Sequence, residues 1–199
     1  NNKDALVRSV QEIVRFPSVE APAAGPGAPF GEAVRGALEN ALNLGKSFGF
    51  ETTNLDGYAG CIDYGCGEEM LGVVAHVDVV PEGEGWIHPP YAAEIADGRI
   101  YGRGTMDDKG PAVCAIYALA AIKAAGIPMR RRVRIILGTN EETGWGCMDH
   151  YRKVAEIPTL TFSPDADYPV VNSEKGIYHA TMRCNAKTKD RKSTRLNSS

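Results

Sequence analysis

Three short apolar runs in this chain each lead into side chains that can bind a metal ion or move a proton. The runs are Leu71–Ala75, Val133–Leu137 and Leu160–Phe162, and runs of this kind are typical of strands buried in a parallel sheet. The polar residues that follow them are, in chain order, His76 and Asp78, Glu141 and Glu142, and Asp165 and Asp167. Because functional groups gather outside the carboxyl ends of the strands in an open α/β sheet, the repetition predicts one site at that edge.

Taken singly, each group also has a purely structural explanation. His76 and Asp78 would face the same way on an extended chain, so the carboxylate could orient a metal-binding imidazole. A histidine at a strand end can equally be a hydrogen-bonded core residue. The adjacent Glu141 and Glu142 could form a solvated turn. The three groups together are harder to explain as loop charges, and they favour a site.

The spacing of apolar residues predicts an α/β fold with a mixed, largely parallel sheet flanked by helices. Helices are expected near 4–16, 31–48, 110–125 and 145–154. Further strands are expected at 51–55 and 60–64, and a hairpin between 93 and 101 leads the chain toward Asp107. The helix near 110–125 reads as a crossover helix, with Pro111 in its first turn and Gly126 as a stop signal.

Several polar residues outside the three groups have simpler interpretations. Asp107 and Asp108 stand just before the predicted crossover helix, where the positive end of the helix dipole favours a carboxylate. Capping alone would therefore explain one of them. Trp86 and His88 are interpreted as structural anchors of their loop, and His150 as a surface residue of its helix.

Composition limits the partners and the compartment. The net charge is −3, no basic stripe suggests nucleic acid, and no apolar run reaches the roughly 18–20 residues of a membrane span. The 199 residues, 43% of them apolar, suit one ordinary soluble domain. The 5 cysteines include no Cys-x-x-Cys pair, and no secretory signal precedes them, so reduced thiols in the cytoplasm are expected.

Four segments of the sequence resemble the motifs of a known family. They are His76-Val-Asp78-Val-Val-Pro81, Gly102-Arg-Gly-Thr-Met-Asp107-Asp108-Lys-Gly-Pro111, Gly138-Thr-Asn-Glu141-Glu142-Thr-Gly-Trp145-Gly, and Ser163-Pro-Asp165-Ala-Asp-Tyr-Pro with Glu174-Lys-Gly176. From Asp4 to about Cys184 the chain resembles the dinuclear zinc dipeptidases and amidohydrolases, which include aminoacylase, acetylornithine deacetylase, succinyl-diaminopimelate desuccinylase and carnosinase. Within this family it is most similar to the PepV-type bacterial dipeptidases. The resemblance implies a zinc-peptidase catalytic domain.

The resemblance also implies two divalent metals, with zinc first and manganese or cobalt as alternatives. It assigns His76 and Glu142 to one metal, Asp165 to the other, and Asp107 to a bridge between them. Such a pair of metals can polarise a carbonyl group and activate a water molecule. The second metal's remaining histidine comes, in the family, from near the end of a longer chain, and none of His88, His150 and His179 matches such a motif.

The implied activity is metal-dependent hydrolysis of the peptide bond of small dipeptide substrates. By resemblance, Glu141 is the general base and Asp78 orients His76 without binding metal. Three alternatives stay open from the residues: a deacylase of N-acyl amino acids, a domain whose metals only hold loops, and a nucleotide-binding domain. Against a nucleotide-binding domain, no Gly-x-Gly-x-x-Gly motif follows the predicted strands of this sequence.

The composition changes abruptly after residue 186. Residues 187–199 are polar, basic and without periodicity, and we interpret them as a non-native tail. Residues 1–186 are interpreted as part of a catalytic domain that ends before a lid domain. The 199-residue chain by itself is therefore expected to be inactive as a peptidase, although the whole enzyme would be active.

Overall fold

The computed structural model describes residues 2–167, 170–173, 175–176, 178 and 180–183. The chain divides into two units, Asn1–Ala166 and Asp167–Ser199. Every helix and strand of the described residues belongs to the first unit. The expectation for the tail at 187–199 lies outside the described residues.

The four helices lie close to where the apolar spacing predicts them. They are α1 (Lys3–Val14), α2 (Glu32–Ser47), α3 (Lys109–Ala124) and α4 (Gly146–Val154). The first, second and fourth are amphipathic, whereas α3 is apolar around most of its circumference because it packs against both the sheet and α1. In the described part of the chain, no helix has the length and apolar character needed to span a membrane.

Five strands form one sheet in the order β1-β2-β6-β3-β7. Their bounds are β1 Glu51–Leu55, β2 Ala59–Tyr64, β3 Met70–His76, β6 Arg132–Gly138 and β7 Leu160–Phe162. Strand β2 is antiparallel to both of its neighbours, and β3 is parallel to both of its own. All strands except β2 therefore run in one direction, which confirms the mixed, largely parallel sheet. Strands β4 (Glu94–Ala96) and β5 (Arg99–Tyr101) form the separate hairpin.

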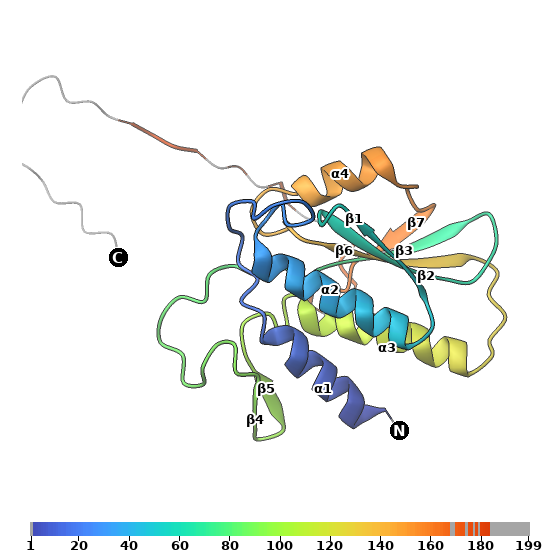
Figure 1. The fold of residues 1–199 in the computed structure, drawn as a ribbon, viewed down its shortest axis with the longest axis horizontal. Helices are drawn as coiled ribbons and strands as arrows, with labels where there is room; N and C mark the ends of the chain where they lie inside the picture. The colour runs from blue at the N-terminus through green and yellow to red at the C-terminus, as the bar shows by residue number, and fades with distance from the viewer. Residues whose placement is uncertain (1, 168–169, 174, 177, 179, 184–199) are drawn as a thin grey trace, which may run out of the picture. The chain divides into compact units, whose positions relative to one another are not determined.

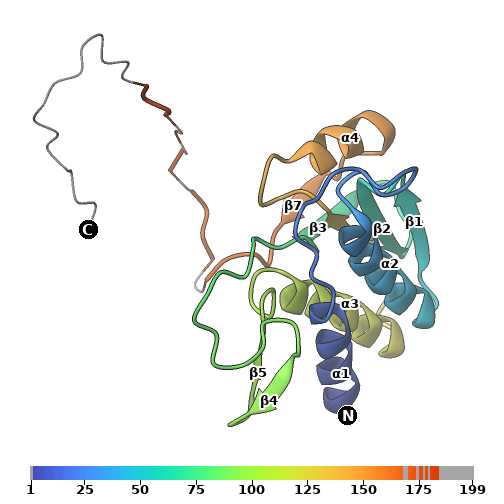
Figure 2. The same cartoon turned by 60° about the vertical axis from the view of Figure 1, so that its left-hand side comes forward.

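Helices cover both faces of the sheet, as Figures 1 and 2 show. Helices α1, α2 and α3 lie on one side, and α4 lies on the other. Ile135 and Ile136 are neighbours on β6 but belong to different apolar clusters, because successive side chains of a strand point to opposite faces. Ile135 packs in the main core beneath α2 and α3, and Ile136 packs with Tyr151 of α4. Full burial of each such side chain is worth about 2 kcal/mol.

The register of the parallel strands brings their carboxyl ends to one edge. His76, the last residue of β3, pairs with Gly138, the last residue of β6. Strand β7 ends at Phe162 opposite Val73, so the chain that follows it runs beside the end of β3. There the Ser163 hydroxyl donates a hydrogen bond to the Val74 carbonyl over 2.8 Å. The loops after β3, β6 and β7 consequently leave the sheet together.

Candidate metal centre

The imidazole of His76 lies at the centre of this edge. His76 is only 2% exposed, and its Nε2 atom faces carboxylates from other loops. Asp107 Oδ1 lies 3.0 Å from Nε2, Asp165 Oδ2 lies 3.3 Å away, and Glu141 Oε2 lies 3.9 Å away. Residues up to 89 positions apart in the sequence thus meet around one buried nitrogen atom.

Two overlapping groups of side chains have the spacing of a metal site. One comprises His76, Asp107 and Glu142, and the other comprises His76, Asp108 and Asp165. Within each group, one potential ligand atom per residue lies within 4.8 Å of the others. The structure therefore brings together the four residues that the sequence proposes as ligands. His76 belongs to both groups, once with Glu142 and once with Asp165.

The residues of the site fit a divalent cation. His76 Nε2 and Asp108 Oδ1 are buried and have no hydrogen-bond partner among the described residues. Leaving such groups buried and unsatisfied costs about 1–3 kcal/mol each, unless another group occupies the space between them. One imidazole among several carboxylates is a donor set suited to zinc or manganese.

The clustered carboxylates also raise one another's pKa. Burial raises the pKa of Asp165 and Glu141, and neighbouring carboxylates add to that effect. Burial raises the pKa of Asp108 to about 7, with the charge of Asp165 acting in the same direction. For His76, burial favours the neutral ring, but Asp78 and the other nearby carboxylates outweigh it and raise the pKa to about 10. Without a metal, this site holds a proton on His76 at neutral pH.

Asp78 contacts both His76 and the backbone of the β6 loop. His76 Nδ1 lies 3.0 Å from the main-chain carbonyl of Asp78 and 3.4 Å from its carboxylate. A carbonyl oxygen can only accept, so Nδ1 is the donor, and a neutral ring then carries its lone pair on Nε2. The other Asp78 carboxylate oxygen accepts the backbone N–H of Glu142 at 3.1 Å. The imidazole is thus oriented chiefly by the main chain of Asp78.

Asp108 was missed as a site residue by the sequence reasoning. It occupies the residue before α3, but its side chain makes no capping hydrogen bond, so the capping explanation is wrong for Asp108. Its Oδ2 atom instead accepts the backbone N–H of His76 at 3.1 Å. The Asp107–Asp108 peptide bond is cis. The run of two aspartates was visible in the sequence, but nothing in it distinguished a buried anchor from a cap.

Asn140 was missed as well, and it shapes the loop that carries the two glutamates. Its side-chain oxygen accepts the backbone N–H of Gly146 at 2.9 Å, and its carbonyl accepts that of Trp145 at 2.7 Å. Its amide nitrogen donates to the Thr143 hydroxyl. Asn140 is buried, so these bonds hold the turn between β6 and α4 closed. The sequence offered no signal for this role.

Trp86, His88 and His150 belong to neither of the two groups of possible metal ligands. The Trp86 ring N–H donates to the Glu82 carbonyl at 2.7 Å, and His88 Nδ1 lies 2.7 Å from a Glu94 carboxylate oxygen. Both contacts agree with structural anchoring. His150 differs from its expected place on the surface, because its side chain is only 23% exposed and its ring stacks on Tyr58 at a centroid distance of 4.4 Å. The β1–β2 turn covers it.

The fold and the site together define an α/β domain with a cluster of histidine and carboxylate side chains, a candidate metal centre, at the carboxyl edge of its sheet. The chain belongs to peptidase family M20/M25/M40, whose model matches residues 72–189. It is 51% identical over 181 residues to YtjP of Bacillus subtilis (strain 168), whose name places it among the dipeptidases. It is 41% identical over 192 residues to a Beta-Ala-Xaa dipeptidase of Lactobacillus delbrueckii subsp. lactis.

These alignments cover most of this chain and a smaller part of the relatives. They include 90% and 96% of the chain but only 39% and 40% of the two relatives, so the chain spans about 40% of their length. Among solved structures, human carnosine dipeptidase 1 matches with a TM-score of 0.65 at 23% identity, covering 76% of this chain and 35% of that one. An M20 family metallo-carboxypeptidase from Sulfolobus solfataricus matches with a TM-score of 0.66 at 17% identity, covering 81% and 37%. These two likenesses support the fold.

Proposed function

We propose that the full-length protein is a metallopeptidase that hydrolyses dipeptides with two divalent metal ions, zinc in the first instance. The observation that carries this proposal is the buried Nε2 atom of His76, which has no hydrogen-bond partner within the described part of the chain and faces carboxylates from three loops. The family membership and the dipeptidase names of the relatives support the same reaction.

His76, Asp107, Glu142 and Asp165 are the residues that would hold the metals. Bound metal ions supply polarisation of the scissile carbonyl and a lowered pKa for the attacking water. Asp107 is the candidate bridge on the strength of the family resemblance, and its Oδ1 atom lies 3.0 Å from His76 Nε2. His76 lies close enough to both Asp165 and Glu142 to share a metal with either one.

Glu141 is the proposed general base. Its carboxylate accepts a proton from the attacking water as the new C–O bond forms, and it delivers that proton to the amine as the C–N bond breaks. Burial raises its pKa, which improves a carboxylate as a base near neutral pH. Asp78 does not touch the reacting atoms in this account; it holds His76 and the backbone of Glu142.

The compartment is proposed to be the cytoplasm. Cys61, Cys66, Cys114 and Cys147 are all free thiols in the part of the chain that the structure describes. Free thiols that persist on the surface, such as Cys66 and Cys114, suit a reducing compartment.

The test uses full-length protein stripped of metal and supplied with zinc, manganese or cobalt. We expect hydrolysis of unmodified dipeptides that disappears with a chelator and returns with added metal. N-acetylated amino acids, matched in side chain, should be cut far more slowly. Preferential cleavage of the acylated compounds would instead identify a deacylase. If the metal stabilised the protein but neither dipeptides nor N-acetylated amino acids were cleaved, the metal site would have only a structural role.

A further inference from the structure

The segment that follows α1 is hydrogen-bonded to the backbone on both sides of Asp78. The Ser18 hydroxyl donates to the Val77 carbonyl at 2.6 Å, and the Ser18 carbonyl accepts the backbone N–H of Val79 at 3.0 Å. Ser18 is completely buried, and about 60 residues separate it from these partners. The two peptide groups that flank Asp78 are therefore tied to a single residue from another part of the chain.

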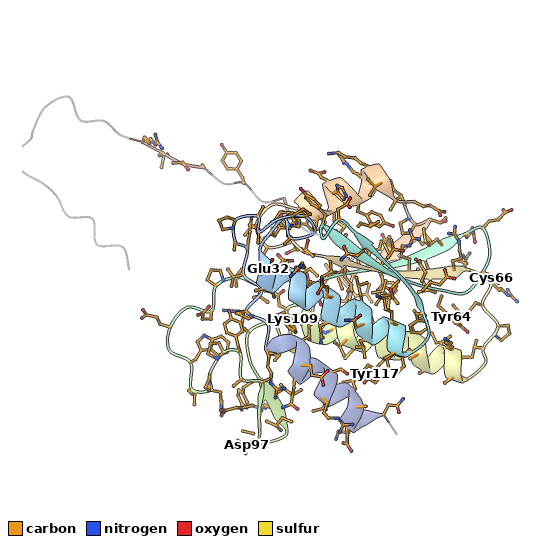
Figure 3. The ribbon with its side chains drawn as sticks, in the orientation of Figure 1. Glu32, Tyr64, Cys66, Asp97, Lys109 and Tyr117 are labelled. Atoms are coloured by element: carbon orange, nitrogen blue, oxygen red, sulfur yellow. The ribbon has the colours of Figure 1, made fainter. Side chains whose placement is uncertain are left out.

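Lys109, which begins α3, ties the same segment to the other side of the site. Its ammonium donates to the Phe16 carbonyl at 2.7 Å, and the residue is completely buried. Figure 3 labels Lys109 on the ribbon. Burying a lysine costs free energy that an apolar side chain would not incur, so simple core packing does not explain it. Lys109 lies two residues after Asp107 in the sequence. The segment from Phe16 to Ser18 thus links the loop of Asp78 to the loop of Asp107.

We propose that Ser18 and Lys109 are positioning residues of the metal centre. They fix the main chain at Asp78, whose carbonyl faces His76 Nδ1 at 3.0 Å and whose carboxylate accepts the Glu142 N–H at 3.1 Å. A shift of the Asp78 main chain would move an imidazole ligand and a carboxylate ligand together. The proposal rests on the metal-dependent function argued above, and it concerns two residues that touch none of the proposed ligands by hydrogen bonds.

The first test replaces Ser18 in the full-length protein and compares it with a matched serine. Ser9 also joins two elements through its hydroxyl, which lies 3.1 Å from the Tyr117 hydroxyl between α1 and α3. We expect Ser18→Ala to weaken zinc binding about 10-fold or more, measured by competition with a chromophoric chelator, because groups that support a ligand typically contribute 10–100-fold. Its kcat should fall while KM changes less than about twofold. Ser18→Thr, which keeps the hydroxyl, should restore both, and Ser9→Ala should leave zinc affinity unchanged.

Lys109→Met tests the other hydrogen bond that holds the segment from Phe16 to Ser18. It keeps the length of the side chain, removes the donor to Phe16, and should also weaken zinc binding. A folded Ser18→Ala protein with unchanged zinc affinity and unchanged kcat would overturn the proposal. Failure of both variants to fold would also count against the proposal, because the hydrogen bonds of Ser18 and Lys109 would then serve the stability of the fold. If the wild type cut no dipeptide, the proposed function would fail, while the zinc affinities would still decide the role of Ser18.

Discussion

The carboxylate of Asp78 accepts the backbone N–H of Glu142 at 3.1 Å, across the ends of two parallel strands. The same residue offers its carbonyl to His76 Nδ1. Asp78 therefore fixes the distance between an imidazole from β3 and a carboxylate from the β6 loop. The strands alone do not set that distance. Strand β3 ends at His76, and β6 ends at Gly138, before Glu142.

Replacement of Asp78 should weaken the site without dismantling the fold. We expect Asp78→Ala to lower zinc affinity and dipeptide turnover together, each by about 10–100-fold. Asp97→Asn, in the exposed turn of the β4–β5 hairpin, is the matched control and should change neither (Figure 3). Zinc titration and steady-state kinetics on the full-length protein measure both quantities. Wild-type zinc affinity in Asp78→Ala would show that the Asp78 carboxylate does not support the site, because alanine keeps the main-chain carbonyl that faces His76.

Substitutions of the two adjacent glutamates should affect turnover and metal binding differently. Glu141→Gln is expected to retain metal and lose about 10²–10⁴-fold in kcat, the usual contribution of a general base. Glu142→Gln should lose metal affinity first and recover part of its activity at high metal concentration. Metal content measured beside turnover distinguishes them. If Glu141→Gln lost metal and activity in parallel, Glu141 would be a ligand.

Metal binding should release a proton. A metal needs the neutral imidazole, whereas in the metal-free site nearby carboxylates outweigh the effect of burial and raise the pKa of His76 to about 10. Below that pKa the apparent affinity for the metal should therefore rise with pH. The rise should be about tenfold per pH unit if one proton is released. A pH of 8 lies above the pKa of about 7 for Asp108 and below the pKa of about 10 for His76, so His76 still holds its proton there.

Calorimetry at pH 8 in two buffers of different ionisation enthalpy counts that proton. We expect about one proton released for each imidazole bound to metal. Equal binding enthalpies in the two buffers would show that His76 is already neutral, or that it is not a ligand.

The Arg134–Asp63 pair on neighbouring strands should contribute to stability. Arg134 donates from Nε and Nη2 to the two Asp63 oxygens at 2.7 and 3.2 Å, and both side chains are mostly buried. Arg134→Met leaves the carboxylate without this partner, so we expect the free energy of unfolding to fall by about 1.5–3 kcal/mol. The exposed Arg152–Asp149 pair on α4 is the control, and Arg152→Met should cost at most about 0.5 kcal/mol. Urea unfolding curves compare the two variants, and equal losses would contradict the prediction.

Much of the fold could be predicted from the sequence because the relevant patterns are local. Helical spacing marked α1 and α2, and the apolar runs marked β3 and β6, each within a few residues of the observed bounds. The candidate ligands could be named for the same reason: a polar residue directly after a buried strand has to lie at the edge where that strand ends.

Burial and long-range hydrogen bonds depended on how the elements pack. Asp108 has the sequence position of a helix cap, and only the approach of β3 to α3 turns its carboxylate toward the His76 backbone. Ser18 and Lys109 gained their contacts when the segment after α1 folded against the loops of Asp78 and Asp107. The amino-acid sequence by itself determined which residues bring the chemistry, through strand and helix patterns that span a few positions. The tertiary structure decided which residues hold them in place, because such contacts join segments from 32 to 93 positions apart.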